Sequence, residues 1–226
     1  MTTRSPPALP LARRVLEWSL HLLAPEICVA CDARVAPFTV MCAACAATLS
    51  PPGRLRPGEI AAFAYGGAIA AAITSFKYGP RVDRARQLAS LLRGAIDPLR
   101  ADPPTLVVPV PLHRARLARR GFNQSALLAA PVARDLGARF APFVVVRARD
   151  TEAQAGLSRE RRQGNVEGAF RARSGGAPGA ALAGARVLLV DDVRTTGATA
   201  DACAAALLGA GARDVRALFL AVAEAE

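Results

Sequence analysis

Short apolar segments alternate with longer amphipathic ones over most of the chain. Several segments of mostly apolar, often β-branched residues have the length of buried strands: 60–65, 105–110, 143–147, 187–190 and 215–222. Helix-like segments lie between them, at 68–77, 82–96, 123–137 and 199–208. This alternation predicts an α/β fold with an open, mostly parallel sheet and flanking helices. Ligands of such sheets bind beyond the carboxyl ends of the strands.

Residues that start or stop helices refine this pattern. Asn123 is a good N-cap and Gly137 a good terminator, so a helix is expected between them. Pro131 lies inside that helix and should kink or shorten it. The pair Gly79 and Pro80 should break the helical segment that comes earlier in the chain.

A Pro- and Gly-containing interruption begins at residue 50 and divides the chain. We expect residues 1–55 to form an N-terminal helix at 11–23 followed by a small cysteine-containing unit. Residues 56–226 should form the α/β domain. The Gly- and Ala-rich segment 174–184 is expected to be a surface loop within that domain.

Basic residues outnumber acidic ones in the 226-residue chain. It has 29 Lys and Arg against 18 Asp and Glu, a formal net charge of +11, and Lys77 is the only lysine. The arginine surplus favours an anionic partner, either nucleic acid or a phosphorylated small molecule, although a biased genome explains the same composition. Because no apolar run is long enough to cross a bilayer and no convincing export signal is present, we expect a cytoplasmic protein without membrane insertion. No feature of the sequence indicates an oligomeric state.

The cysteines form a recognisable pattern. Cys28 and Cys31 make one Cys-x-x-Cys pair, and Cys42 and Cys45 make a second. Two such knuckles placed face to face supply the tetrahedral thiolate set of a structural Zn²⁺ site and leave no open position for a catalytic water. The alternatives are two disulfides or a redox-active dithiol, which a reducing compartment and the duplication disfavour. Cys203 lies in an Ala-rich helical segment and is expected to be a buried small hydrophobe.

A polar segment follows the apolar strand at 187–190. Asp191 and Asp192 come first, and their carboxylates can accept hydrogen bonds from two vicinal hydroxyls. The next residues offer hydroxyls and backbone N–H groups at the start of a helix, where phosphate binds: Arg194, Thr195, Thr196, Gly197, Ala198 and Thr199. Diol acceptors a few residues before a phosphate-binding turn match a ribose 5-phosphate. The alternative is that the acids merely end a strand and the threonines cap a helix.

This order of strand, acid pair and Thr/Gly turn resembles the phosphoribosyl pyrophosphate (PRPP) fingerprint of the type I phosphoribosyltransferases. Further motifs resemble the ComF family of competence-associated proteins, in which a zinc ribbon precedes a phosphoribosyltransferase-like domain: Phe76-Lys77-Tyr78, Val108 to Gln124, Thr151 to Leu157 and Arg162 to Phe170. The resemblance spans about residues 25–223. The turn at Gly79 and Pro80 departs from the family pattern, so no role is carried over to Asp83.

The resemblance implies a type I phosphoribosyltransferase-like domain that binds PRPP with Mg²⁺, preceded by a four-cysteine zinc ribbon, and a role in natural competence. It implies that Asp191 and Asp192 are catalytic and hold the ribose. Residues behind the strand at 105–110 match the region of the pyrophosphate loop, where guanidinium groups bind phosphate oxygens: His113, Arg114, Arg119 and Arg120. Arg162 matches the loop that closes over the active site.

Two classes of function stay open from the sequence. The first is a PRPP-binding phosphoribosyltransferase whose acceptor base is not identified. The second is an adaptor that binds single-stranded DNA, or a PRPP sensor without turnover, which acts with a protein of the competence machinery. The aromatic content of 5% offers no evident base-stacking platform, but a basic surface can contact a DNA backbone.

Overall fold

The computed structural model describes residues 26–79, 83–147, 168–173 and 182–223. A five-stranded sheet forms its centre, in the order β1-β7-β6-β2-β3, and all neighbouring strands are parallel. These strands are β1 (Glu59–Ala64), β2 (Leu106–Pro109), β3 (Arg139–Phe140), β6 (Arg186–Arg194) and β7 (Asp214–Val222). The predicted α/β fold with an open, mostly parallel sheet is confirmed.

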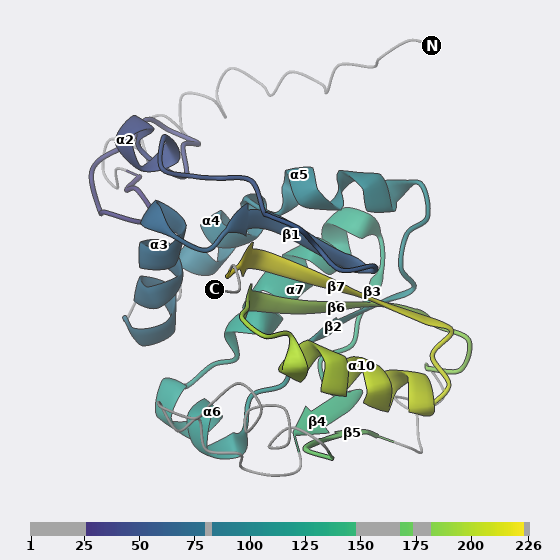
Figure 1. Cartoon of the computed structure of the whole chain (residues 1–226). Coiled ribbons are helices and arrows are strands. Elements are labelled where there is room, and N and C mark those ends of the chain that lie inside the picture. Colours follow the sequence, from purple (N-terminus) through teal and green to yellow (C-terminus); the bar gives the residue numbers. More distant parts are fainter. Residues whose placement is uncertain (1–25, 80–82, 148–167, 174–181, 224–226) are drawn as a thin grey trace, which may run out of the picture.

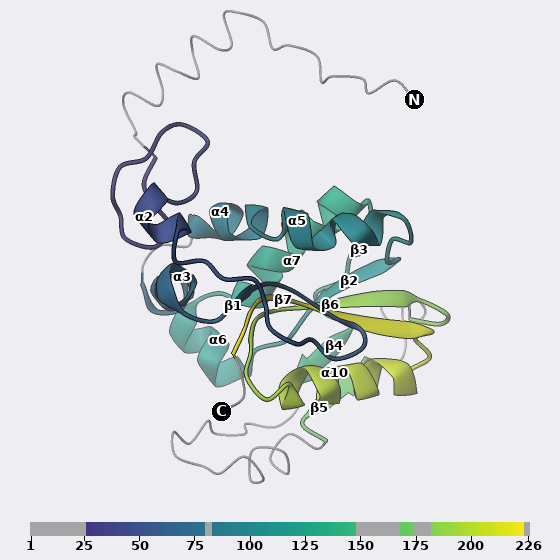
Figure 2. The same cartoon turned by 45° about the horizontal axis from the view of Figure 1, so that its top comes forward.

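Helices cover both faces of this sheet (Figure 1, Figure 2). One face carries α3 (Gly67–Tyr78), α4 (Arg84–Ser90), α5 (Arg93–Ile96), a 3₁₀ turn (Asp97–Arg100) and α7 (Gln124–Leu136). The other face carries α10 (Ala198–Gly209) and a small antiparallel sheet of β4 (Val145–Arg147) and β5 (Phe170–Ala172). Two short helices complete the described part, α2 (Ala43–Ala46) and α6 (Arg114–Arg120).

Side-chain alternation along β6 accounts for the two layers. Leu188 and Val190 join the buried cluster under α3, α4 and α7, whereas Val187 and Leu189 join the cluster under α10. Because both faces of the sheet are covered, the strand is apolar at successive positions, as the sequence pattern indicated.

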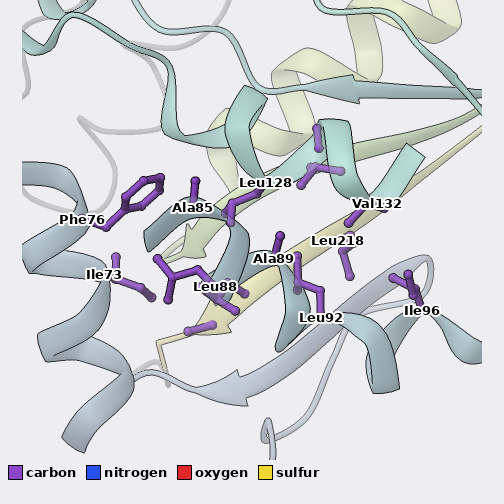
Figure 3. Close-up of a cluster of buried hydrophobic side chains, with 14 of the residues drawn as sticks. Ile73, Phe76, Ala85, Leu88, Ala89, Leu92, Ile96, Leu128, Val132 and Leu218 are labelled. Carbon is purple, nitrogen blue, oxygen red and sulfur yellow. The ribbon is translucent and has the colours of Figure 1, made fainter. Parts of the chain in front are cut away.

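The larger core lies between the sheet and the helices of its first face. Ile73 and Phe76 of α3, Leu88 of α4 and Leu128 of α7 gather there (Figure 3). Burying a side chain of this size contributes about 1.5–3 kcal/mol. This packing fixes the C-terminal end of α3 and the N-terminal end of α7 beside the carboxyl ends of the strands.

The cysteine-containing segment shares this core. Cys28, Val29 and Met41 belong to the same buried cluster as Ile69 and Phe76. The segment therefore packs directly on α3 and does not rest on a hydrophobic core of its own. The division into residues 1–55 and 56–226 stays a prediction.

Two strand predictions need correction. The strand predicted at 187–190 continues to Arg194, because β7 pairs with it in parallel register as far as Val222. The strand predicted at 143–147 is present as β4, but it lies outside the central sheet and pairs only with β5. Apolar composition indicated burial correctly, yet it carried no information about the pairing partner.

The helix predicted at 123–137 is confirmed as α7, with Asn123 as its N-cap and Gly137 in the left-handed conformation at its end. Pro131 does not shorten it, since packing of α7 against the sheet outweighs one missing backbone hydrogen bond. Cys203 is fully buried, as expected. Among the described residues, no helix combines the length and apolarity needed to span a membrane. The predicted helix at 11–23 and most of the predicted loop at 174–184 lie outside the described residues.

Candidate functional site

The acid pair lies inside β6, near its carboxyl end. The sequence had suggested two carboxylates side by side after the strand. Because successive side chains of a strand point to opposite faces, the two carboxylates instead diverge. Asp192 is buried, and its Oδ1 lies 3.0 Å from Nζ of Lys77 at the end of α3. Asp191 Oδ1 accepts a hydrogen bond of 2.7 Å from the hydroxyl of Ser125, at the start of α7.

The two carboxylates still influence each other. Burial and the neighbouring charge of Asp192 raise the pKa of Asp191 to about 7, although the Ser125 hydroxyl and the Lys77 charge act in the opposite direction. Among the described residues, Asp192 Oδ2 is buried without a hydrogen-bond partner. Lys77 therefore pairs with one oxygen of Asp192, and the other oxygen stays unsatisfied at the buried side of the acid pair.

The predicted phosphate turn connects β6 to α10. Its residues surround one hollow of about 50 Å³, which Asp191 and Phe219 also line: Arg194, Thr195, Thr196, Gly197, Ala198 and Thr199. Gly197 is the N-cap of α10 and has a φ of +87°, a conformation that glycine adopts without strain. The turn therefore presents hydroxyls and the N-terminus of a 12-residue helix to the same hollow as Asp191.

Arg194 lies at this hollow, but its charge is matched. Its Nε lies 3.3 Å from Oε2 of Glu59 in β1, and both side chains are largely buried. Burial would raise the pKa of Glu59, but hydrogen bonds from Arg56 and the charge of Arg194 outweigh it and hold that pKa below its ordinary value. Sequence reasoning missed Arg56 and Glu59, because Arg56 belonged to a segment interpreted only as an interruption and Glu59 to the edge of an apolar strand.

The pyrophosphate region differs in local structure from the expectation. The residues predicted to lie on a loop after β2 form the helix α6, and the His113 side chain caps it by accepting a hydrogen bond of 3.2 Å from the backbone N–H of Ala115. Arg114 and Arg119 are exposed on this helix. The Arg120 guanidinium lies over the ring of Tyr78, 5.4 Å from its centre.

Two motifs that are far apart in the sequence meet at this edge. The rings of Phe76 and Phe122 lie 5.6 Å apart, and Arg120 bridges to Tyr78, so the Phe76-Lys77-Tyr78 motif packs on the segment that links α6 to α7. The side chain of Asn123 donates to the carbonyl of Val110, which ties this segment to the end of β2. The structure thereby brings Lys77 to the acid pair, a role that the motif alone did not reveal.

Arg162 and the motif from Thr151 to Leu157 lie outside the described residues. Their expected role at a closing loop stays a prediction.

The predicted cysteine cluster is assembled. The sulfur atoms of Cys28, Cys31, Cys42 and Cys45 all lie within 4.8 Å of one another, and those of Cys31 and Cys42 are 3.7 Å apart. Tetrahedral Zn²⁺ with Zn–S bonds of about 2.3 Å places its sulfurs about 3.8 Å apart. The cluster can therefore bind a metal such as zinc, and all five cysteines are free of disulfides.

Thiol ionisation in the cluster also favours a cation. Burial opposes ionisation of Cys28, but backbone N–H groups lower the pKa of its thiol to about 6. Hydrogen bonds with Cys31 and Cys42 and the nearby Cys28 raise the pKa of Cys45 to about 12. Since four thiolates repel one another at this distance, full ionisation needs a bound metal ion.

A buried arginine fastens the first knuckle to the α/β domain. Arg84 is 1% exposed, donates to the carbonyl of Val29 at 2.9 Å and to Ser75 Oγ at 2.7 Å, and forms an ion pair with Asp32. Ser75 lies on α3, two residues before Lys77. The knuckle and the acid pair are thus attached to the same helix.

Comparison with known proteins agrees with the motifs. No protein-family model matches the chain. The chain is 40% identical over 113 residues to the DNA utilization protein YhgH of Escherichia coli strain K12. This match covers 50% of this chain and 47% of the YhgH chain. It is also 36% identical over 118 residues to Competence protein F of Haemophilus influenzae. That match covers 52% of this chain and 50% of Competence protein F. The chain spans about half the length of the curated relatives it matches.

Two solved structures share part of the architecture. Glutamine PRPP amidotransferase from B. subtilis has a TM-score of 0.41 at 18% identity, over 65% of this chain and 30% of that one. Purine phosphoribosyltransferase from Pyrococcus horikoshii has a TM-score of 0.32 at 16% identity, over 64% of this chain and 82% of that one. The sequence relatives, over the half of each that matches, confirm the resemblance to the ComF family.

Proposed function

We propose that the protein binds PRPP with Mg²⁺ at the carboxyl end of β6. The observation that carries this proposal is the single hollow shared by Asp191 and the turn from Arg194 to Thr199. A ribose 5-phosphate needs diol acceptors and an anion site at a short distance from each other, and no other pairing of this kind was indicated by the sequence.

Each group has a defined task in this proposal. The carboxylates of Asp191 and Asp192 accept hydrogen bonds from the ribose hydroxyls, and the ion pair with Lys77 orients Asp192. Backbone N–H groups and threonine hydroxyls of the turn hold the 5′-phosphate. Arg114, Arg119 and Arg120 of α6 hold the pyrophosphate, and His113 fixes the start of that helix. Mg²⁺, when bound, neutralises charge on the pyrophosphate oxygens.

Titration with Mg²⁺·PRPP tests the site. We expect saturable binding by the zinc-loaded protein and its loss in the double variant Asp191→Asn, Asp192→Asn. The matched control is Asp97→Asn with Asp102→Asn, which makes the same charge change at exposed positions. Unchanged affinity in the first double variant would remove the assignment. Pyrophosphate release with a panel of nucleobases then separates a transferase from a sensor.

We infer zinc as the metal of the cysteine cluster, in a structural role. Four thiolates complete its tetrahedral shell, so no position is left for a reacting water. Metal analysis should find about one zinc per chain.

A second candidate function is binding of single-stranded DNA in DNA utilization or competence. The names of the sequence relatives and the net charge of +11 favour it. Binding should be independent of sequence and should weaken steeply between about 50 and 200 mM salt, because it rests on phosphate contacts. Fluorescence anisotropy with a labelled oligothymidylate measures this, and no binding at low salt removes the candidate.

A further inference from the structure

Arg56 reaches from the segment between the cysteine cluster and β1 to the start of α10. Its Nη1 and Nη2 donate to the two carboxylate oxygens of Asp201 at 2.9 and 3.0 Å. Its Nε and its backbone N–H donate to the two carboxylate oxygens of Glu59 at 2.8 and 3.0 Å. The guanidinium is thus held by two carboxylates in a fixed plane.

This guanidinium lies directly against Gly197. A Cβ at Gly197 would overlap the Nη2 and Cζ atoms of Arg56. Gly197 also has a φ of +87°, so its backbone conformation disfavours any other residue as well. The Arg56 guanidinium therefore packs closely against the residue at the centre of the phosphate turn.

Arg56 also balances the negative charge of Asp201 near the turn. Asp201 lies in the first turn of α10, and Glu59 contacts both Arg56 and Arg194. Without Arg56, the Asp201 carboxylate would stand unpaired at the helix end where an anion binds, and like charges at that distance repel. Arg56 neutralises Asp201 and leaves the N–H groups of the turn available to a phosphate.

We propose that Arg56 is a positioning residue for a 5′-phosphate-binding turn: it holds Gly197 in place and neutralises the Asp201 carboxylate behind it. This role rests on the proposed PRPP site. In this role Arg56 acts through the turn, since four of its five guanidinium N–H groups donate to the two carboxylates.

Binding of ribose 5-phosphate and of inorganic pyrophosphate, each measured separately by calorimetry, tests the role. In Arg56→Ala we expect at least a tenfold weaker affinity for ribose 5-phosphate and an affinity for pyrophosphate within twofold of the wild type. Adding Asp201→Asn to Arg56→Ala should recover part of the lost affinity, because it removes the repulsive charge. The control is Arg54→Ala, an exposed arginine of the same segment, which should bind like the wild type.

The outcomes separate the two levels of the proposal. A wild-type protein that binds neither ligand overturns the proposed function and this role with it. A wild-type protein that binds both, together with unchanged ribose 5-phosphate affinity in Arg56→Ala, overturns the role of Arg56 alone. Equal loss for both ligands, without recovery by Asp201→Asn, identifies Arg56 as a general structural residue and also overturns it.

A stability measurement tests the close approach without any ligand. Gly197→Ala should lower the thermal midpoint more in the wild type than in the Arg56→Ala background, where the collision is absent. Gly137→Ala introduces the same kind of positive-φ strain, with φ of +65°, in open space, so its cost should be equal in both backgrounds. Equal costs of Gly197→Ala in both backgrounds contradict the proposed contact.

Discussion

The cysteine cluster and the carboxyl edge of the sheet are both polar sites, but the chain builds them over very different distances. The four thiols come from residues 28–45, and two short turns are sufficient to bring them together. The carboxyl edge pairs Arg56 with Asp201, Lys77 with Asp192 and Ser125 with Asp191, because separate elements pack on one sheet. A local site can be recognised from spacing, whereas a distributed site needs the fold.

The two regions are also connected. Arg84 ties the first knuckle to Ser75 on α3, and the same helix carries Lys77 to Asp192. Thr48 joins them a second time, because its hydroxyl accepts from the backbone N–H of Ala68 at the start of α3. Damage to the cluster should therefore reach the sheet edge through α3, and the following variants measure how far.

The largest effect is expected from loss of the metal. Cys42→Ser with Cys45→Ser removes half of the thiolates, and structural zinc contributes on the order of 10 kcal/mol in small zinc domains. Because the segment shares its core with α3, we expect the thermal midpoint of the whole chain to fall by about 10 °C or more. Cys203→Ala, a change at a cysteine outside the cluster, should retain the metal. A double variant with full zinc content would show that the cluster is not the metal site.

The buried arginine should rank second. Arg84→Met leaves the carbonyl of Val29 and the hydroxyl of Ser75 without their donor, and we expect a loss of about 2–4 kcal/mol in urea unfolding. Arg86→Met, an exposed change on the same helix, should stay within about 0.5 kcal/mol of the wild type. Equal effects of the two substitutions would mean that Arg84 does not fasten the knuckle.

The acid pair should make stability depend on pH. The pKa of Asp191 is about 7 in the folded protein, above the ordinary value of about 3.9, so the fold favours the protonated carboxyl. This contribution is complete below about pH 4 and is lost as the pH rises through 7. Without divalent cations, we expect wild-type stability relative to Asp191→Asn to fall by on the order of 2 kcal/mol between about pH 5 and 8. A constant difference between the two proteins over this range would contradict the raised pKa.

Loss of the contact between Tyr78 and Arg120 should have the smallest effect on stability. Tyr78→Leu removes the ring beneath the Arg120 guanidinium, and an exposed cation–π contact contributes about 0.5–1 kcal/mol. Phe143→Leu, at an aromatic residue that is also well exposed, is the matched control and should change stability less. Indistinguishable losses in urea unfolding would remove the cation–π contribution.

Several features of the fold followed from local sequence alone. Asn123 and Gly137 marked the ends of α7 correctly, and the apolar runs located most strands, because caps and burial depend on neighbouring residues. The end of β6 was misjudged, since its length depends on register with β7. The expected loop after β2 became α6, because the His113 side chain and Gly121 supply the caps of a short helix that the arginine content had obscured.

The candidate site divides in the same way. The acid pair, the Thr/Gly turn and the four cysteines were identified from their order and spacing, because each group is contiguous in the chain. Arg56, Glu59 and Ser125 were not, because nothing in their local sequence relates them to residues far along the chain; Arg56 and Asp201 are 145 positions apart.

By itself, the sequence determined which chemical groups the protein possesses: a thiolate set for a metal, two adjacent carboxylates and a phosphate-type turn before a helix. Only the tertiary structure decided how these groups are paired and charged. Lys77 matches Asp192, Arg194 matches Glu59, and Arg56 lies against Gly197 and Asp201. The physical reason is that hydrogen bonds and ion pairs act over a few ångströms, and parallel strands with crossing helices bring distant residues within that range at one edge of the sheet.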